Sequence, residues 1–314
     1  MAVITCAVAL KPSATVQAAK PRNWAVLNVQ AGPIPLPFQA AIFRRSHRNL
    51  GKKEIAADYP EKGSGMWFFR RPGDPVFRKM GSLNDRPHIL VGGGIENVPL
   101  RLRSGFECSI SFAMGGIWYR GMEALFTEPG TYTFQFSEGD ELEMIVKETR
   151  GTDKVICNLL RTNPSLAEAM LSYDKIPEDD LLKPLQRIVT LYPKSSYANY
   201  ARFALARWHA GRDGDWSAAT VGDVDSQPVA ALLADIDVEF AYAPHALILR
   251  FHVLQSMHFP EADEVLATLE QVHFDSSEYL VFLSGRLNQD EWNTRNPRAP
   301  RKIPVIQAKR TPVR

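Results

Sequence analysis

The chain has 314 residues, of which 45% are hydrophobic and 23% are charged. A chain of this length and composition can bury a sizeable core and is long enough for two ordinary domains, which excludes a small disulfide-stapled fold. No apolar run in the sequence approaches the roughly 18 to 20 residues that a membrane-spanning helix needs, so we expect no membrane span.

Charge is distributed unevenly, although the net charge is only +2. Residues 22–150 carry 17 basic and 14 acidic side chains, residues 151–294 carry 11 basic and 21 acidic ones, and residues 295–314 carry seven basic and no acidic ones. Four prolines interrupt this last segment, so we predict a disordered basic tail over residues 293–314. The tail lacks aromatic residues for base stacking, which favours a solvated tail over the alternative of an arm that binds nucleic acid.

The cysteines give no sign of a metal centre. Cys6, Cys108 and Cys157 are too few and too widely spaced for a zinc site, which needs four ligands and usually takes them from closely spaced pairs. Two interpretations of Cys108 and Cys157 stay open: a disulfide in an oxidising compartment, or two buried free thiols.

The first 21 residues have some features of an export signal. Residues 2–10 are mostly apolar, and Val16-Gln17-Ala18 suits cleavage by signal peptidase, but the basic segment that normally comes first is missing. We therefore expect an exported protein if the start codon lies upstream of Met1, and a cytoplasmic one otherwise. The alternatives are a lipoprotein signal with Cys6 as the modified residue, a short first strand and a disordered end.

Between residues 22 and 150 the apolar residues alternate or form short blocks bounded by turn residues, which indicates strands. About eight short strands with no helical interval predict an antiparallel β-sandwich. Within it, the phrase Phe126-Thr127-Glu128-Pro129-Gly130-Thr131-Tyr132 resembles the strand corner of immunoglobulin-like domains in exported bacterial proteins. At such a corner we expect the Tyr132 ring to be buried while its hydroxyl bonds to nearby backbone.

After Gly151 the apolar residues follow the period of amphipathic helices. One apolar stripe ends at Tyr192-Pro193, where the proline stops the helix, and a second helix follows Ser195-Ser196. Small alanines beside aromatic residues in the second helix are typical of closely packed hairpins. Further helical pairs are expected over residues 229–257 and 260–287.

The segment from Tyr192 to Arg207 resembles bacterial tetratricopeptide-like repeats, although the later units lack Tyr-Pro and a strict 34-residue period. This resemblance implies a protein-binding surface, with Tyr197, Tyr200, Arg202 and Arg207 as candidate contact residues. The alternative is a plain helical bundle that braces the sandwich.

Motifs for common chemistries are missing from the sequence. We find no HExxH, no Gly-x-Ser-x-Gly and no phosphate-binding glycine loop, so we predict no catalytic residue, no bound metal and no cofactor. His245 and His252 are seven residues apart on one expected helix, and we interpret them as packing or surface histidines rather than as metal ligands.

A second binding hypothesis concerns the sandwich. Trp118 and Tyr119 lie in a glycine-flanked loop that suits stacking on a sugar, and Arg44, Arg45 and Arg48 form part of a basic stretch that suits an anionic polymer. Core packing is the alternative for Trp118 and Tyr119, and a solvated hairpin is the alternative for the basic stretch.

The sequence thus predicts an α+β chain in separate domains. An all-β immunoglobulin-like sandwich spans residues 22–150, and all-α tetratricopeptide-like hairpins span residues 151–292. The predicted function is a non-enzymatic interaction or scaffold protein of the bacterial cell envelope that binds a protein partner through the hairpins. The alternative is a glycan-binding or anionic-polymer-binding protein.

Overall fold

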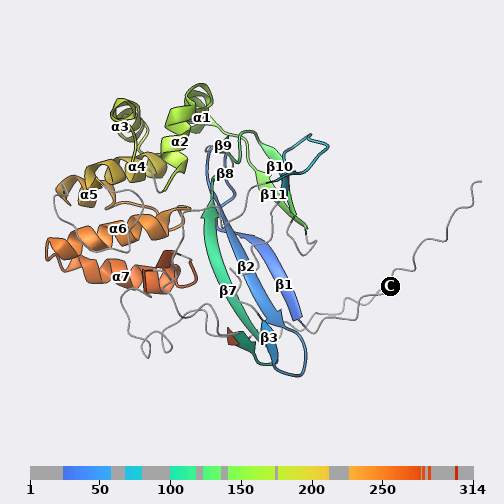
Figure 1. Cartoon of the computed structure of the whole chain (residues 1–314). Coiled ribbons are helices and arrows are strands. Elements are labelled where there is room, and N and C mark those ends of the chain that lie inside the picture. Colours follow the sequence, from blue (N-terminus) through green and yellow to red (C-terminus); the bar gives the residue numbers. More distant parts are fainter. Residues whose placement is uncertain are drawn as a thin grey trace, which may run out of the picture.

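A computed structural model describes residues 24–57, 68–79, 100–117, 123–135, 141–173, 176–211, 226–276, 278–279, 282–283 and 301–302. It has mixed α+β architecture, with antiparallel strands in the first half and helices in the second, as Figure 1 shows. The predicted order of strands followed by helices is therefore confirmed. Residues Trp118 and Tyr119, the first 21 residues and most of the tail lie outside the described residues.

The strands form two larger sheets. The first has the order β1 (Trp24–Ala31), β2 (Ala41–Asn49), β7 (Phe106–Met114), β12 (Arg301–Lys302), and the second has the order β11 (Glu141–Val146), β10 (Gly130–Gln135), β4 (Phe68–Arg70), β5 (Arg78–Lys79). Two smaller pairs are β3 (Ile55–Ala57) with β6 (Leu100–Leu102) and β8 (Gly116–Ile117) with β9 (Glu123–Ala124). Every strand pair among the described residues is antiparallel.

The two larger sheets bury their apolar faces against each other. Alternate residues of a strand point to the same face, so Ala41 and Phe43 of β2 reach one core, together with Met114 of β7. From the second sheet, Phe134 of β10 and Met144 of β11 join that core. The rings of Phe43 and Phe134 meet edge to face at 5.1 Å.

The predicted strand corner at Tyr132 is confirmed in its local geometry. The ring is fully buried, and its hydroxyl accepts hydrogen bonds from the backbone N–H groups of Thr127 and Glu128, both at 3.2 Å. The same hydroxyl donates to the Glu128 carbonyl at 3.1 Å. Gly130 has a φ of 134°, which a residue with a side chain rarely adopts, so the glycine is needed to start β10.

Two differences from the expected strands concern basic residues. Strand β2 continues to Asn49, so Arg44, Arg45 and Arg48 lie on a regular strand rather than on a solvated hairpin. In the segment predicted to be a disordered tail, Arg301–Lys302 pairs with Phe106–Glu107 as an edge strand. An edge position suits a proline-interrupted segment because only one side of the strand has to pair.

The second half contains α1 (Gly151–Thr162), α2 (Pro164–Leu171), α3 (Leu182–Leu191), α4 (Ala198–Ala210), α5 (Ser226–Leu232), α6 (Ala243–Ser256) and α7 (Glu261–Val272). A short 3₁₀ turn, η2 (Asp179–Leu181), precedes α3. Helix α3 stops before Pro193, as predicted, and α4 ends at Gly211, whose left-handed backbone closes the last turn. From α3 to α7 each helix packs against the next one, and α2 packs against both α1 and α4.

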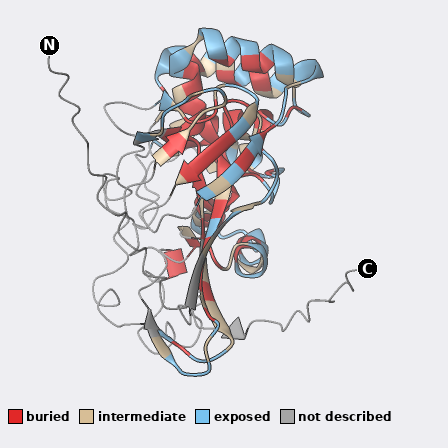
Figure 2. Ribbon diagram, turned by 90° about the vertical axis from the view of Figure 1, so that its right-hand side faces the viewer, coloured by how far each residue is buried: buried red, intermediate tan, exposed pale blue. Residues whose placement is uncertain are grey.

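The sheets and the helices share part of their core. Phe38, Ala40 and Ala113 come from the first half, and they pack in one hydrophobic cluster with residues of α1 to α6. Figure 2 shows buried residues concentrated where the helices meet the strands and exposed residues on the outer faces of the helices. We call this contact between sheets and helices, formed by the residues of the shared cluster, the seam. Residue 150 therefore separates two kinds of secondary structure, while the hydrophobic core continues across it.

Both cysteines of the described part are buried free thiols. Cys108 packs with Leu102 beside β6, whereas Cys157 lies in the core shared by sheets and helices. Of the two interpretations of these cysteines, the structure has the free thiols. No described helix is both long enough and apolar enough to cross a membrane.

Candidate functional site

The two tyrosines predicted to contact a partner lie inside the seam. Tyr197 is fully buried, and its hydroxyl donates to the carbonyl of Pro37 at 2.5 Å. Tyr200 accepts a hydrogen bond from the Ala40 N–H at 2.8 Å, and its hydroxyl lies 3.4 Å from the Ala40 carbonyl. Burial raises the pKa of both phenols above the usual value of 10, so both stay neutral. These residues join α4 to the segment between β1 and β2.

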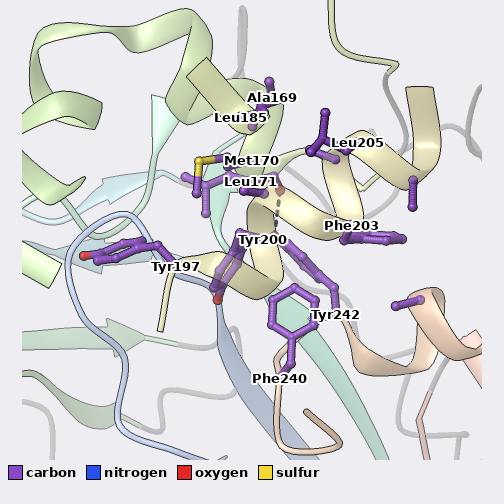
Figure 3. Packing of buried hydrophobic residues seen from close by; sticks show 14 of the residues in the cluster. Ala169, Met170, Leu171, Leu185, Tyr197, Tyr200, Phe203, Leu205, Phe240 and Tyr242 are labelled. Atoms are coloured by element: carbon purple, nitrogen blue, oxygen red, sulfur yellow. Dashed lines mark hydrogen bonds between the residues drawn. The ribbon is translucent and has the colours of Figure 1, made fainter. Parts of the chain in front are cut away.

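Other aromatic rings surround Tyr200. Phe240 and Tyr242, which precede α6, meet it edge to face at 4.6 and 5.8 Å. Figure 3 shows these rings together with Phe203, and its dashed line marks the bond from the Tyr242 hydroxyl to the Leu171 carbonyl, 2.7 Å long. The hydroxyls of Tyr200 and Tyr242 thus both bond to backbone groups, as buried hydroxyls require.

A shared carboxylate fixes the start of α4. Asp153 of α1 accepts hydrogen bonds from the Ser195 hydroxyl at 2.6 Å and from the Ser196 backbone N–H at 3.2 Å. Its second oxygen accepts from the Ser196 hydroxyl at 3.1 Å, and Gln39 donates to the same hydroxyl oxygen at 2.8 Å. Negative charge beside the first turn of a helix is stabilising. The Asp153 carboxylate links α1 to the start of α4, and Gln39 links Ser196 to the segment between β1 and β2.

The two arginines predicted beside these tyrosines differ in exposure. Arg207 is fully buried; it donates to the Ala169 carbonyl at 2.6 Å and its guanidinium lies over the Phe203 ring at 5.1 Å. Arg202 is half-buried and bonds locally, to Asn199 and to the Pro193 carbonyl. Only Arg202 of the four candidate residues therefore reaches the surface. The motif that resembles a binding repeat mainly packs helices.

Strand alternation separates the arginines of the basic stretch. Arg45 points to the sandwich side of β2 and is 3% exposed, whereas Arg44 and Arg48 point to the opposite face. Arg44 forms an ion pair with the buried Asp275 at 2.9 Å, and Arg48 pairs with Glu107. Carboxylates thus neutralise the two outward arginines, so the stretch forms no continuous cationic surface.

The residues after α7 form a strap between the helices and β7. The Ser111 N–H donates to the Asp275 carbonyl at 2.7 Å, and Ser276 forms an isolated parallel β-bridge with Ser111. Glu278 lies 3.8 Å from the imidazole of His245, and both side chains are buried. We call residues 273–276 and 278–279 the strap.

The histidines of α6 do not form a metal site. His245 packs against the Tyr173 ring at 4.5 Å, and His252 packs against Phe282 at 5.6 Å. Within the described ranges, no group of three or more His, Cys, Asp or Glu side chains is arranged to hold a metal ion.

One candidate site that was not predicted from the sequence is a run of exposed acidic residues over residues 226–272. Seven acidic residues of this segment are exposed, and Arg250 is its only lysine or arginine. Three apolar side chains of the same segment are also exposed: Val238 is 39% exposed, Phe259 44% and Val272 49%. We call this the acidic surface; its carboxylates are Asp235, Asp237, Glu239, Glu261, Asp263, Glu264 and Glu270. The imbalance of seven acidic residues against one arginine is readable from the sequence.

Comparisons with known proteins assign no family. No protein-family model matches the chain, and no curated protein is similar to it. Among solved structures, the β-glucosidase of Listeria innocua in complex with glucose gives a TM-score of 0.24 at 12% identity, and a mutant of that enzyme in complex with laminaribiose gives 0.22 at 13%. Each match covers 40% of this chain and 16% of the enzyme, so the chain spans about a sixth of that enzyme's length. Similarity at this level establishes neither a fold family nor a function.

Proposed function

We propose that this chain is a non-enzymatic interaction protein whose acidic surface, on the segment between α5 and α6 and on α7, binds a basic segment of a protein partner. The observation that carries this proposal is the composition of that surface, where seven exposed carboxylates lie with exposed Val238, Phe259 and Val272. Apolar side chains contribute contact area, and a field of one sign favours partners of the opposite sign.

The seam supports this proposal because it holds the helices rigidly on the sheets. Tyr197, Tyr200 and Ser196 bond across it at one end, and Asp275 bonds to Arg44 at the strap. Helices fixed in this way present a surface that loses little conformational freedom on binding. A sandwich that braces helices is one of the alternatives that the sequence left open.

We also retain the two resemblances as part of the proposal. The buried Tyr132 corner supports an immunoglobulin-like sandwich, and the pairing of α3 with α4 supports tetratricopeptide-like hairpins. Export to the bacterial envelope is proposed from the apolar segment at residues 2–10 and the cleavage-site residues Val16-Gln17-Ala18. Mass spectrometry of the native protein's ends tests export: cleavage after Ala18 or lipidation of Cys6 supports it, and an intact Met1 in the cytosol contradicts it.

Photo-crosslinking in native cells tests the proposed surface. A photoreactive residue is placed at Phe259 or Val238 and, as a matched control, at Leu50 or Val76, which are exposed apolar residues of the sheet half. We expect both helical positions to capture the same partner through a Lys/Arg-rich segment, with no capture from the control positions. Charge reversal in the variant Asp263→Lys, Glu264→Lys should reduce the crosslinked yield several-fold.

The proposal fails if the captured segment is not basic, if capture comes only from the sheet positions, or if charge reversal leaves the yield unchanged. The alternative of binding an anionic polymer through Arg44, Arg45 and Arg48 gains no support. One of these arginines is buried and the other two are paired with carboxylates.

A further inference from the structure

Strand β11 is the outermost described strand of the second sheet, and no other described strand pairs with its outer side. Its inward side chains, Met144 and Val146, are buried in the sandwich core. Its outward side chains, Glu141, Glu143 and Ile145, are exposed, and Ile145 is 56% exposed. The inner face of β11 is therefore packed in the sandwich core, while the outer edge of its backbone pairs with no described strand.

One hydrogen bond shows which backbone groups face this edge. The Lys147 N–H donates to the Pro35 carbonyl at 3.0 Å, and Pro35 lies between β1 and β2, outside the second sheet. The Lys147 amide therefore points away from β10. Alternate residues of a strand direct their N–H and C=O groups to the same side, so Ile145 and Glu143 direct theirs to the same open edge.

At the carboxyl end of β11, the outer edge already bonds to the segment before β2 through Lys147 and Pro35. Residues 32–37 read Gly-Pro-Ile-Pro-Leu-Pro, and the three prolines have no N–H to donate. The pairing of this segment with β11 is limited to the bond at Lys147, which leaves the stretch 141–145 for an added strand. The exposed side chain of Ile34 lies next to Pro35 in the sequence, near the end of this stretch.

The charges of Glu141 and Glu143 determine which kind of strand can pair with residues 141–145. A second copy of this chain paired along residues 141–145 places Glu143 opposite Glu143 or Glu141, and like charges directly opposite are destabilising. An extended segment with lysine or arginine at alternate positions instead places cations opposite Glu141 and Glu143. The same two glutamates thus disfavour self-association and favour a basic strand.

We propose that the edge of β11 at residues 141–145 binds an extended basic peptide segment by adding it to the sheet as a further strand. Main-chain hydrogen bonds from Glu143 and Ile145 supply affinity, and the two glutamates select cationic side chains. This site is separate from the acidic surface of the helices and does not depend on it.

The first test is a titration of the full-length protein with a short labelled peptide in which Lys and Val alternate, followed by fluorescence anisotropy. The matched probe carries Glu in place of Lys. We expect the Lys peptide to bind and the Glu peptide to bind at least about ten-fold more weakly, because two cross-strand charge pairs change sign. The double variant Glu141→Lys, Glu143→Lys should reverse this preference, whereas Asp180→Lys, which changes an exposed carboxylate outside both proposed sites, should leave it unchanged.

The second test separates strand addition from surface attraction. Ile145→Pro removes a donor that points to the open edge and leaves the bonds to β10 intact, so the fold tolerates it at an edge strand. Ile145→Thr keeps the donor and is the control. We expect Ile145→Pro to weaken binding of the Lys peptide about ten-fold and Ile145→Thr to weaken it less than about three-fold.

Amide hydrogen exchange of the unmodified protein gives the third readout. The amides of Glu143 and Ile145 should become protected when the Lys peptide is added, while the Met144 amide, which already faces β10, should not change. Three outcomes overturn the proposal: no binding of the Lys peptide, equal binding of both peptides, or full binding by a folded Ile145→Pro variant.

Discussion

Helices α4 and α7 are almost equally long, but they occupy opposite environments. Nine of the 13 residues of α4 are buried, whereas only three of the 12 residues of α7 are. Helix α4 combines tyrosine, phenylalanine and alanine with no acidic residue, while α7 carries four acidic residues. Aromatic residues beside alanines therefore mark the helix that joins the two halves, and carboxylates mark the helix that faces outward.

The comparison also explains why the tyrosines of α4 look like contact residues. Each has a large apolar ring and a polar hydroxyl, a combination that suits both a protein interface and a buried seam. In this chain the seam is an internal interface, because Tyr197 and Tyr200 bond to Pro37 and Ala40, 160 residues away in sequence. The resemblance to binding repeats marks a real contact surface, and the chain itself covers it.

The largest expected effect comes from removing a ring of α4. Tyr200→Ala should destabilise the protein by about 3–5 kcal/mol, because the ring is buried among Phe240 and Tyr242 and leaves a cavity. The matched change on α7, Glu264→Ala, should stay within about 0.5 kcal/mol, since that side chain is exposed. Urea unfolding measures both, and similar losses for the two variants would remove the distinction between the helices.

The next effect isolates the hydroxyl from the ring. Tyr200→Phe keeps the packing but leaves the Ala40 N–H without its partner, so we expect a loss of about 1–3 kcal/mol. The control on α7 is Thr268→Ala, whose hydroxyl bonds only to the carbonyl of Glu264 on its own helix. Its loss should stay below about 0.5 kcal/mol by the same urea measurement. A Tyr200→Phe variant as stable as the parent protein would show that this bond across the seam contributes nothing.

The sequence predicted the elements of the fold better than their contacts. Alternation predicted β7, β10 and β11, the helical period predicted α3, α4 and α6, and Pro193 predicted the end of α3. These signals are local, because each follows from how neighbouring side chains point. The hydrogen bonds of Tyr132 were predictable for the same reason, since their partners lie four and five residues away.

The placement of the candidate residues was not predictable, because periodicity identifies an apolar face but not what covers it. Nothing near Tyr197 in the sequence indicates that Pro37 and Ala40 cover α4. The separation of Arg45 from Arg44 follows from strand alternation, but only once β2 is known to continue through the basic run. The acidic surface was readable in composition, but its exposure depends on how α6 and α7 pack.

The third prediction concerns the strap, which joins the outward helices to the sheet. Asp275→Asn keeps the shape of the side chain but removes the charge that pairs with Arg44, so we expect a loss of about 1–2 kcal/mol in urea unfolding. The control is Glu107→Gln, whose pair with Arg48 is more exposed and should contribute less than about 1 kcal/mol. A larger loss for Glu107→Gln than for Asp275→Asn would contradict the conclusion that the pair of Asp275 with Arg44 holds the helices on the sheet at the strap.

The smallest effect is a pH dependence at the start of the strap. Burial lowers the pKa of His273 below its usual 6.5, although the carboxylates of Glu278 and Asp275 act in the opposite direction. The unfolded chain therefore binds a proton at this position more readily than the folded protein does. Stability from this group is complete above pH 6.5 and falls as the pH drops below that value towards the lowered pKa.

This dependence is measured as the difference in urea midpoint between pH 7.5 and pH 6.0, in the parent protein and in His273→Gln. Glutamine does not titrate, so the variant should lose less stability over this range than the parent protein. The other histidines and the pair of His245 with Glu278 are common to both proteins and cancel in the comparison. An equal loss in the two proteins would mean that His273 titrates alike in the folded and unfolded states, and that the strap does not shield it from water.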